Sequence, residues 1–174
     1  MISLDLSLAS SADALAALEQ YPERYAVELR NAMLEAGLLL ERQIKELAPV
    51  GVGGAAGYRG SIAAIPPYMN GDILTGGVGT SAPYAVPVEL GTRPHFPPVQ
   101  PIADWVRAKL GEKDPDAARS IAYCIARKIA AHGTEGQHVF KRALDAAQEQ
   151  LAVIFDRAVE RTVNAGAARA GGEA

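Results

Sequence analysis

A stripe of apolar residues between positions 25 and 47 is the strongest periodic pattern in the chain. Its members recur at steps of three and four, the spacing of one helix face: Tyr25, Leu29, Met33, Ala36, Leu40, Ile44 and Leu47. Pro22 suits the first helical position, where its missing N–H is not needed. Charged residues occupy the other face, so we expect a helix over residues 22–47 with one buried side and one solvated or partner-facing side.

Residues 2–8 alternate instead between apolar and polar, which is typical of a half-buried strand. A short helix is expected to follow over residues 10–20. Two more strands are predicted over residues 61–65 and 73–78, joined through the turn dipeptide Asn70-Gly71. The pattern therefore predicts an α+β fold, in which a small antiparallel or mixed sheet packs against the long helix.

Two helices are predicted within residues 98–132 from their start and stop signals. Pro101 at a first helical position and Gly111 after the last turn frame one of them. Asp114 as N-cap before a proline, and Gly133 at the end, frame the other. The residues expected to face inward in the first are Ile102, Trp105, Val106 and Leu110. The stripe of the second is traced by Ala118, Ile121, Ile125, Lys128 and Ile129.

Thr134 and Gln137 have the spacing of a capping box, which predicts that a last long helix begins there and runs through Thr162. The Ala- and Gly-rich residues 164–174 offer no apolar face and are predicted to be a disordered tail. We therefore expect a single α+β domain over residues 1–163, with a helical insertion at about 98–132 and additional C-terminal helices.

Residues 78–96 combine prolines and glycines in a way that predicts a sharply shaped connector. A short helical turn over residues 82–90 should end at Gly91. The carboxylate of Glu89 is expected to accept N–H bonds at Gly91 and Thr92, or to pair with Arg93. The predicted structural turn comprises Tyr84, Glu89, Gly91 and Thr92, and the candidate contact residues are Arg59, Arg93, Pro94 and His95.

Composition narrows the function classes. With a net charge of −3 the whole chain lacks the basic footprint of most nucleic-acid binders. Cys124 is the only cysteine, which excludes an intrachain disulfide, and the surrounding apolar pattern favours a small core residue there. The N-terminus does not read as a signal peptide, and no apolar run approaches the ~20 residues of a membrane span.

Patterns that carry chemistry are few. The histidines His95, His132 and His138 have no Cys or His partners at zinc-site spacing. The glycine-rich residues 51–60 follow a predicted helix and lack the Gly-Lys-Ser/Thr of a phosphate-binding loop, so we expect a mobile loop instead. There is no Gly-x-Ser-x-Gly elbow. No cofactor, metal site or catalytic set is therefore expected.

A series of short motifs follows the chain in this order: Ala48-Pro49, Gly60-Ser61-Ile62, Pro83-Tyr84-Ala85, Val88-Glu89-Leu90-Gly91-Thr92-Arg93-Pro94-His95, and Gly133-Thr134 leading to Val139-Phe140-Lys141-Arg142-Ala143-Leu144. The series resembles the tail-component family of long-tailed bacteriophages, which are small neck or tail-completion proteins encoded between the head and tail genes. The resemblance implies an α+β fold, assembly into a ring at the head–tail junction or tail end, and no catalysis. It also implies other neck and tail proteins as partners and a place in the virion after assembly in the host cytoplasm.

Two other functions stay open at this point. A small-ligand-binding protein or enzyme would use Glu89, Arg93 and His95 as a polar cluster. A DNA-contacting connector would need a local basic patch, for which the candidates are Arg59, Arg93, Arg107 and Lys109.

Overall fold

The computed structural model describes residues 3–5, 19, 22–50, 57–70 and 73–170. These residues form the expected α+β fold, with a small antiparallel sheet packed against a long helix and further helices toward the C-terminus. The predicted helix over residues 10–20 and the outer parts of the first strand lie outside the described residues, apart from Glu19, which is helical. None of the helices in the described ranges has a stretch long and apolar enough to span a bilayer.

The chain forms two compact units, where the sequence predicts one domain. The first, which we call the sheet unit, comprises Ile2–Leu47, Ile62–Thr80 and Phe140–Ala174. The second, the turn unit, comprises Ala48–Ser61 and Ser81–Val139. The predicted insertion at about 98–132 is present as two helices of the turn unit, where they pack mainly on each other.

The sheet has the strand order β1-β3-β2 and is antiparallel throughout. It consists of β1 (Ser3–Asp5), β2 (Ile62–Asn70) and β3 (Ile73–Thr80). Strand β2 is longer than predicted because its pairing with β3 shifts between Ile65 and Tyr68, which lets two prolines pass without ladder bonds. Since β2 lies at the sheet edge, proline is tolerated there.

Helix α2 (Pro22–Leu47) covers the sheet through contacts with β2 and β3. The predicted stripe is largely confirmed, with Met33, Leu40 and Ile44 among its buried residues. A β-carbon at Gly37 would lie 3.3 Å from the carbonyl oxygen of Gly77. Glycines on both the helix and the strand therefore let the two backbones approach closely.

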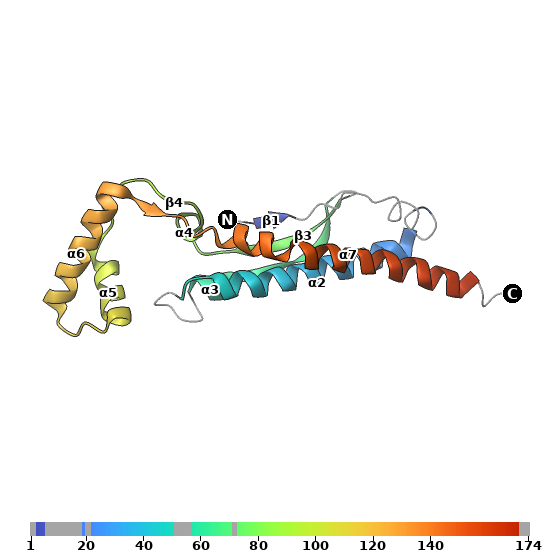
Figure 1. Ribbon diagram of the computed structural model, residues 1–174, viewed down its shortest axis with the longest axis horizontal. Coiled ribbons are helices and arrows are strands. Elements are labelled where there is room, and N and C mark those ends of the chain that lie inside the picture. Colours follow the sequence, from blue (N-terminus) through green and yellow to red (C-terminus); the bar gives the residue numbers. More distant parts are fainter. Residues whose placement is uncertain (1–2, 6–18, 20–21, 51–56, 71–72, 171–174) are drawn as a thin grey trace. The chain divides into compact units, whose positions relative to one another are not determined.

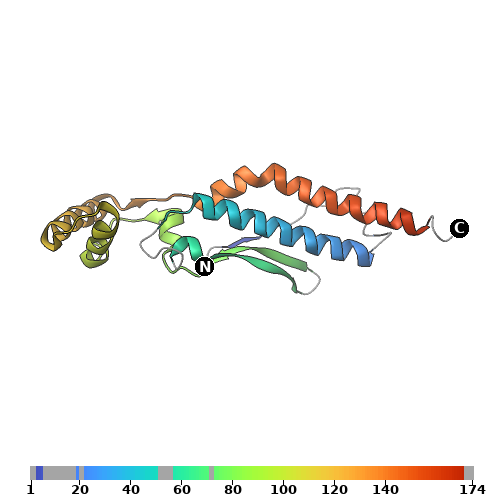
Figure 2. The same cartoon turned by 90° about the horizontal axis from the view of Figure 1, so that it is seen from below.

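Helix α7 (Val139–Ala170) runs alongside α2, with the sheet on the other side of α2 (Figures 1 and 2). The two helices are antiparallel, because Glu28 pairs with Arg161 at 3.3 Å while Gln43 bonds Gln150 at 3.3 Å. Tyr25 is buried near their ends against Leu29 and Val159. The polar face of α2 therefore partly faces α7 and is not wholly solvated.

Both ends of α7 differ from the sequence prediction. The helix begins at Val139, because Thr134 and Glu135 form the strand β5 (Thr134–Glu135), so the predicted capping box is wrong. The helix continues to Ala170, so the prediction of disorder is wrong for residues 164–170. Alanine is the best helix former and extends an already nucleated helix at little cost.

The turn unit contains α3 (Tyr58–Ser61), α4 (Ala85–Leu90), β4 (Gly91–Thr92), α5 (Val99–Leu110), α6 (Pro115–His132) and β5. The end of α5 and both ends of α6 follow the sequence signals, whereas α5 begins at Val99, two residues before the predicted Pro101. Gly111 ends α5 in the left-handed conformation, and the Asp114 side chain accepts the N–H of Asp116 at the start of α6. Residues 58–60 are helical where a loop is predicted, and Ser61 is helical where a strand is predicted. Residues 51–56 lie outside the described part.

The seam between α5 and α6 is made of small residues. It buries Ala103 and Val106 of α5, and Ala118, Ala122 and Ala126 of α6. Three residues predicted to face inward are instead exposed: Trp105 is 40% exposed, Leu110 60% and Ile121 37%. A pair of helices has one shared seam, and alanines bring the helices so close that the larger side chains fall outside it.

We predict that the Glu41 carboxylate stabilises the sheet unit by satisfying an edge-strand donor. It accepts the backbone N–H of Ala64 in β2 at 2.7 Å and also pairs with Lys45. Replacing Glu41 by Ala should lower the free energy of unfolding by about 2 kcal/mol, because the Ala64 N–H loses a charged acceptor. Chemical denaturation measures this, and the control Glu46→Ala, at an exposed pair with Arg42, should cost about 0.5 kcal/mol.

The Glu41 carboxylate also makes the stability of the sheet unit depend on pH. The hydrogen bonds from Lys45 and Ala64 hold the pKa of Glu41 below its ordinary value of 4.5. A lowered pKa adds stability at neutral pH that is lost as the pH falls through the folded-state value. The difference in stability between wild type and Glu41→Ala should therefore shrink in acid, and a difference that stays constant would contradict this role.

Candidate functional site

The predicted turn at residues 84–96 is held by a second segment far along the chain. Strand β4 pairs antiparallel with β5, with Gly91 opposite Glu135 and Thr92 opposite Thr134. The two threonine hydroxyls lie 3.0 Å apart. On the α4 side, Gln137 N donates to Val88 O at 2.8 Å and His138 N donates to Glu89 O at 3.1 Å. Residues 88–93 and 133–138 thus form one hydrogen-bonded structure.

Three glycines let these two segments cross at backbone distance, and we call Gly91, Gly133 and Gly136 the glycine crossing. A β-carbon at Gly91 would lie 2.2 Å from Thr134 O, and one at Gly133 would lie 2.0 Å from Thr92 O. One at Gly136 would lie 2.4 Å from Glu89 O. Gly91 and Gly133 also have φ values of 77° and 71°, which side-chain-bearing residues rarely adopt. No other residue type fits these positions without moving the backbone.

His138 adds strain to the same place. Its φ of 49° is the one positive value of a non-glycine residue in the described ranges. Its N–H is held by the Glu89 carbonyl, directly before α7 begins. Such a conformation persists where the surrounding contacts fix it, so the crossing determines where the last helix starts.

The short helix α4 ends at Gly91 as predicted, but the bonds at Gly91 and Thr92 come from backbone groups. Gly91 N donates to Pro87 O at the end of α4, and Thr92 lies in the β4–β5 pair. Glu89 is buried, 6% exposed, and its negative charge acts on Tyr58. The Glu89 carboxylate therefore belongs to the inner side of the turn unit.

Tyr58 lies buried beside this carboxylate. It is 2% exposed, and its hydroxyl oxygen has no hydrogen-bond partner among the described residues. Its ring centroid is 6.2 Å from that of Tyr84, which is 46% exposed. Burial, and then the charge of Glu89, raise the pKa of Tyr58 to about 12.

Three of the other candidate residues lie at the surface. Arg93, Pro94 and His95 are exposed, and Arg59 is half-buried. The His95 ring nitrogen Nδ1 lies 2.9 Å from the carbonyl oxygen of Arg93. Within the described residues, the side chains of Arg93 and His95 make no hydrogen bond or ion pair with Glu89, so the three do not form a polar cluster.

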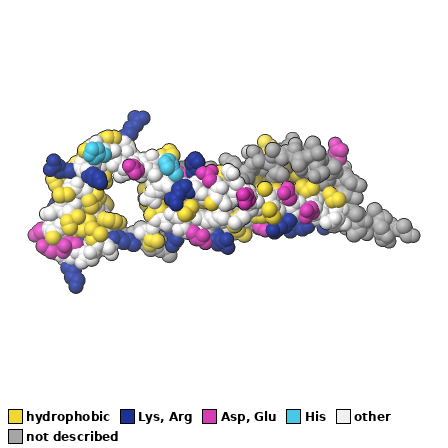
Figure 3. Space-filling model, viewed as in Figure 1, with side chains coloured by type: hydrophobic (Ala, Val, Ile, Leu, Met, Phe, Trp, Pro, Cys, Tyr) yellow, Lys and Arg dark blue, Asp and Glu magenta, His cyan; other side chains and the backbone are white. Residues whose placement is uncertain are grey.

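The turn unit exposes large apolar side chains, which the sequence pattern did not predict. Hydrophobic atoms gather over α5 and α6, bordered by charged groups (Figure 3). The exposed large apolar side chains of the turn unit are Val50, Tyr84, Val86, Leu90, Phe96, Trp105, Leu110, Ile121 and Tyr123. A helical apolar stripe can face either its own core or a partner, and periodicity alone does not distinguish them.

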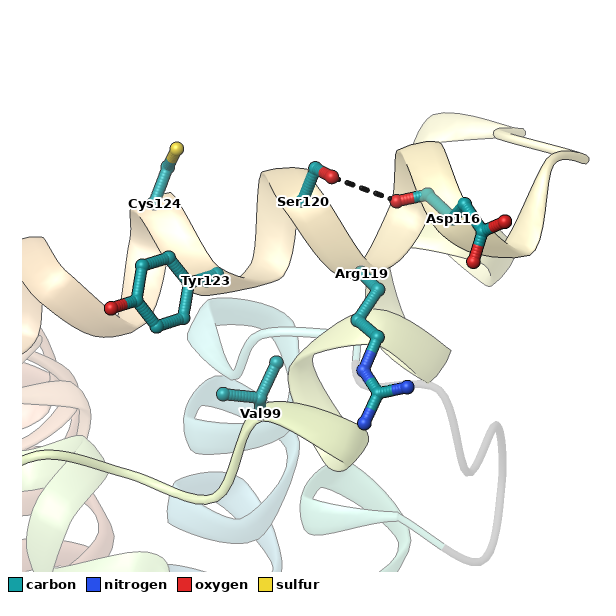
Figure 4. A pocket seen from close by; sticks show the side chains of 6 residues that line it. All are labelled: Val99, Asp116, Arg119, Ser120, Tyr123 and Cys124. Atoms are coloured by element: carbon teal, nitrogen blue, oxygen red, sulfur yellow. Dashed lines mark hydrogen bonds between the residues drawn. The ribbon is translucent and has the colours of Figure 1, made fainter.

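A cavity of about 570 Å³ opens between α6 and the start of α5. Figure 4 shows Tyr123 and Arg119 extending from α6 toward the start of α5, on either side of Val99. Cys124, predicted as a core residue, is exposed and lines this cavity with Ser120. The Ser120 hydroxyl donates to the backbone carbonyl of Asp116, an ordinary bond within a helix.

The described residues contain no group of three or more His, Cys, Asp and Glu side chains placed to hold a metal ion. Comparisons with protein-family models, curated proteins and solved structures gave no match. The turn unit thus combines a hydrogen-bonded backbone crossing with an exposed apolar surface.

We predict that Gly136→Ala destabilises the turn unit by about 2–3 kcal/mol, because the new methyl group would overlap the Glu89 carbonyl. Gly111→Ala is the matched control. Gly111 has a φ of 72° but no atom within 4 Å of its would-be β-carbon, so only the conformational cost of about 1 kcal/mol applies. Urea unfolding with amide NMR signals of the turn unit measures both, and equal losses would contradict the crossing.

We predict that Tyr58 makes the turn unit sensitive to high pH. Because its pKa is raised, the neutral phenol favours the folded state, and this stability is complete below pH 10 and lost as the pH rises to about 12. The loss is about 3 kcal/mol. Tyr58→Phe should remove it and cost little at neutral pH, since the hydroxyl has no partner in the described residues.

Denaturation at increasing pH, together with the ultraviolet absorbance of tyrosinate, measures this effect. The control is Tyr84→Phe, which removes the hydroxyl of the exposed neighbouring ring and keeps Tyr58 in place. An unchanged profile in Tyr58→Phe would show that another group causes the loss.

Proposed function

We propose that this protein is a structural component of a bacteriophage virion, which oligomerises into a ring at the neck or tail end and completes the tail or joins it to the head. The observation that carries the proposal is the exposed apolar surface of α5 and α6, which includes Trp105, Leu110 and Tyr123. Contiguous exposed apolar surface of this kind typically marks a protein–protein contact. The motif series from Ala48 to Leu144 supplies the phage context.

The glycine crossing suits such a role. A ring subunit must present its contact surface in a fixed geometry, because small angular errors accumulate around a closed ring. The crossing ties the residues before α5 to those after α6 through backbone bonds. The start of α5 and the end of α6 are therefore held together by the glycine crossing. Arg93, Pro94 and His95 lie next to this crossing and serve as contact residues.

The alternative, a small-ligand-binding protein or enzyme, would need Glu89, Arg93 and His95 to converge. Glu89 is buried while Arg93 and His95 are exposed, and their side chains do not bond to one another. Assembly is the better account of these residues. No specific observation favours the DNA-contacting alternative. Arg107 pairs with Asp104, and the turn unit carries charges of both signs.

We predict that the purified protein forms one discrete oligomer, seen as a closed ring by electron microscopy and as a single mass by native mass spectrometry. Particles purified from the producing host should contain a fixed small number of copies. A strict monomer at high concentration, absent from mature particles, would contradict the proposed function.

A further inference from the structure

A groove of about 470 Å³ lies between α2 and α7 of the sheet unit. Its apolar lining is Leu39, Val153 and Ile154, of which Val153 is 44% exposed. Its charged lining is Glu35, Glu149 and Arg157. No ion pair within the described residues engages these three side chains. The groove therefore offers apolar surface beside carboxylates that are available to another molecule.

Helix α6 exposes an aromatic ring and basic side chains, which complement the apolar surface and the carboxylates of the groove. Tyr123 is 51% exposed and packs edge-on against Phe96, with ring centroids 6.0 Å apart. Arg119 and Arg127 lie one helical turn before and after Tyr123, on the same face. Tyrosine and arginine are the residues most often found at the energetic centre of interfaces. The contact with Phe96 orders the Tyr123 ring before binding, which lowers the entropy cost of docking.

The charges of the two units favour contact between different copies. The turn unit has eight Lys and Arg against six Asp and Glu, a net charge of +2. The sheet unit has nine against fourteen, a net charge of −5. Within α6, residues 117–132 include three basic residues and no acid. Opposite patches on the two units of one chain attract head to tail, the arrangement that closes into a ring.

We propose that α6 of one copy docks in the α2–α7 groove of a second copy. Tyr123 is the apolar anchor and enters between the two helices of the groove. Arg119 and Arg127 pair with the carboxylates of Glu35 and Glu149, and Arg157 is placed to meet Asp116. The inference rests on the proposed ring assembly and specifies its contact.

Charge reversal with mixing tests the contact. Arg127→Glu and Glu149→Lys should each weaken self-association at least ~10-fold, measured by analytical ultracentrifugation. An equimolar mixture of the two variants should restore it, because each reversed charge then meets a reversed partner on the other copy. A contact within one chain would not be restored by mixing. The control reversals Lys113→Glu and Glu23→Lys, outside the two surfaces, should leave association within about twofold of wild type.

Cross-linking through the native Cys124 gives an independent measurement. Val153→Cys should form cross-links between copies with a short bis-maleimide, whereas Val27→Cys, on another part of α2, should not. A wild-type ring that tolerates both reversals and gives no Val153→Cys cross-link would overturn this contact and leave the proposed function standing. A monomeric wild type would overturn both.

Discussion

The turn unit depends on the backbone contact between residues 88–93 and 133–138. At Gly91, Gly133 and Gly136 the two segments are too close for any β-carbon. The N–H groups of Gln137 and His138 and the β4–β5 pairing join the second segment to the first. The contact also brings together the chain before α5 and the chain after α6, and it holds the strained His138 before α7 begins.

This arrangement separates stability from recognition. The buried parts of the turn unit are small or internally bonded, with Ala103, Ala118 and Ala122 in the helix seam. The large apolar side chains, among them Trp105 and Leu110, contribute little to that seam and remain at the surface. A protein that works by assembly needs such a division, because its contact residues must be presented without weakening the fold of the subunit.

Local signals in the sequence predicted much of the fold. The helix over residues 22–47 and the caps at Gly111 and Asp114 follow from periodicity and capping chemistry, which act over a few residues. The strand β5 could not be found in this way, because Thr134 pairs with Thr92 across 42 positions and this pairing overrides the capping-box spacing. Glu41 was missed for a related reason, since its partner Ala64 is brought to it only by the packed sheet. The candidate site was found by its prolines and glycines, but the role of Gly136 requires the second segment.

Hydrogen–deuterium exchange of the protein, dilute and then concentrated, tests most directly whether a rigid crossing supports an assembly surface. We expect the amides of Gly91, Gln137 and His138 to exchange slowly in both states, whereas amides of α6 and of the α2–α7 groove should become protected only when the protein is concentrated. Fast exchange at the crossing, or no change at α6 as oligomers form, would contradict a rigid crossing that supports an assembly surface.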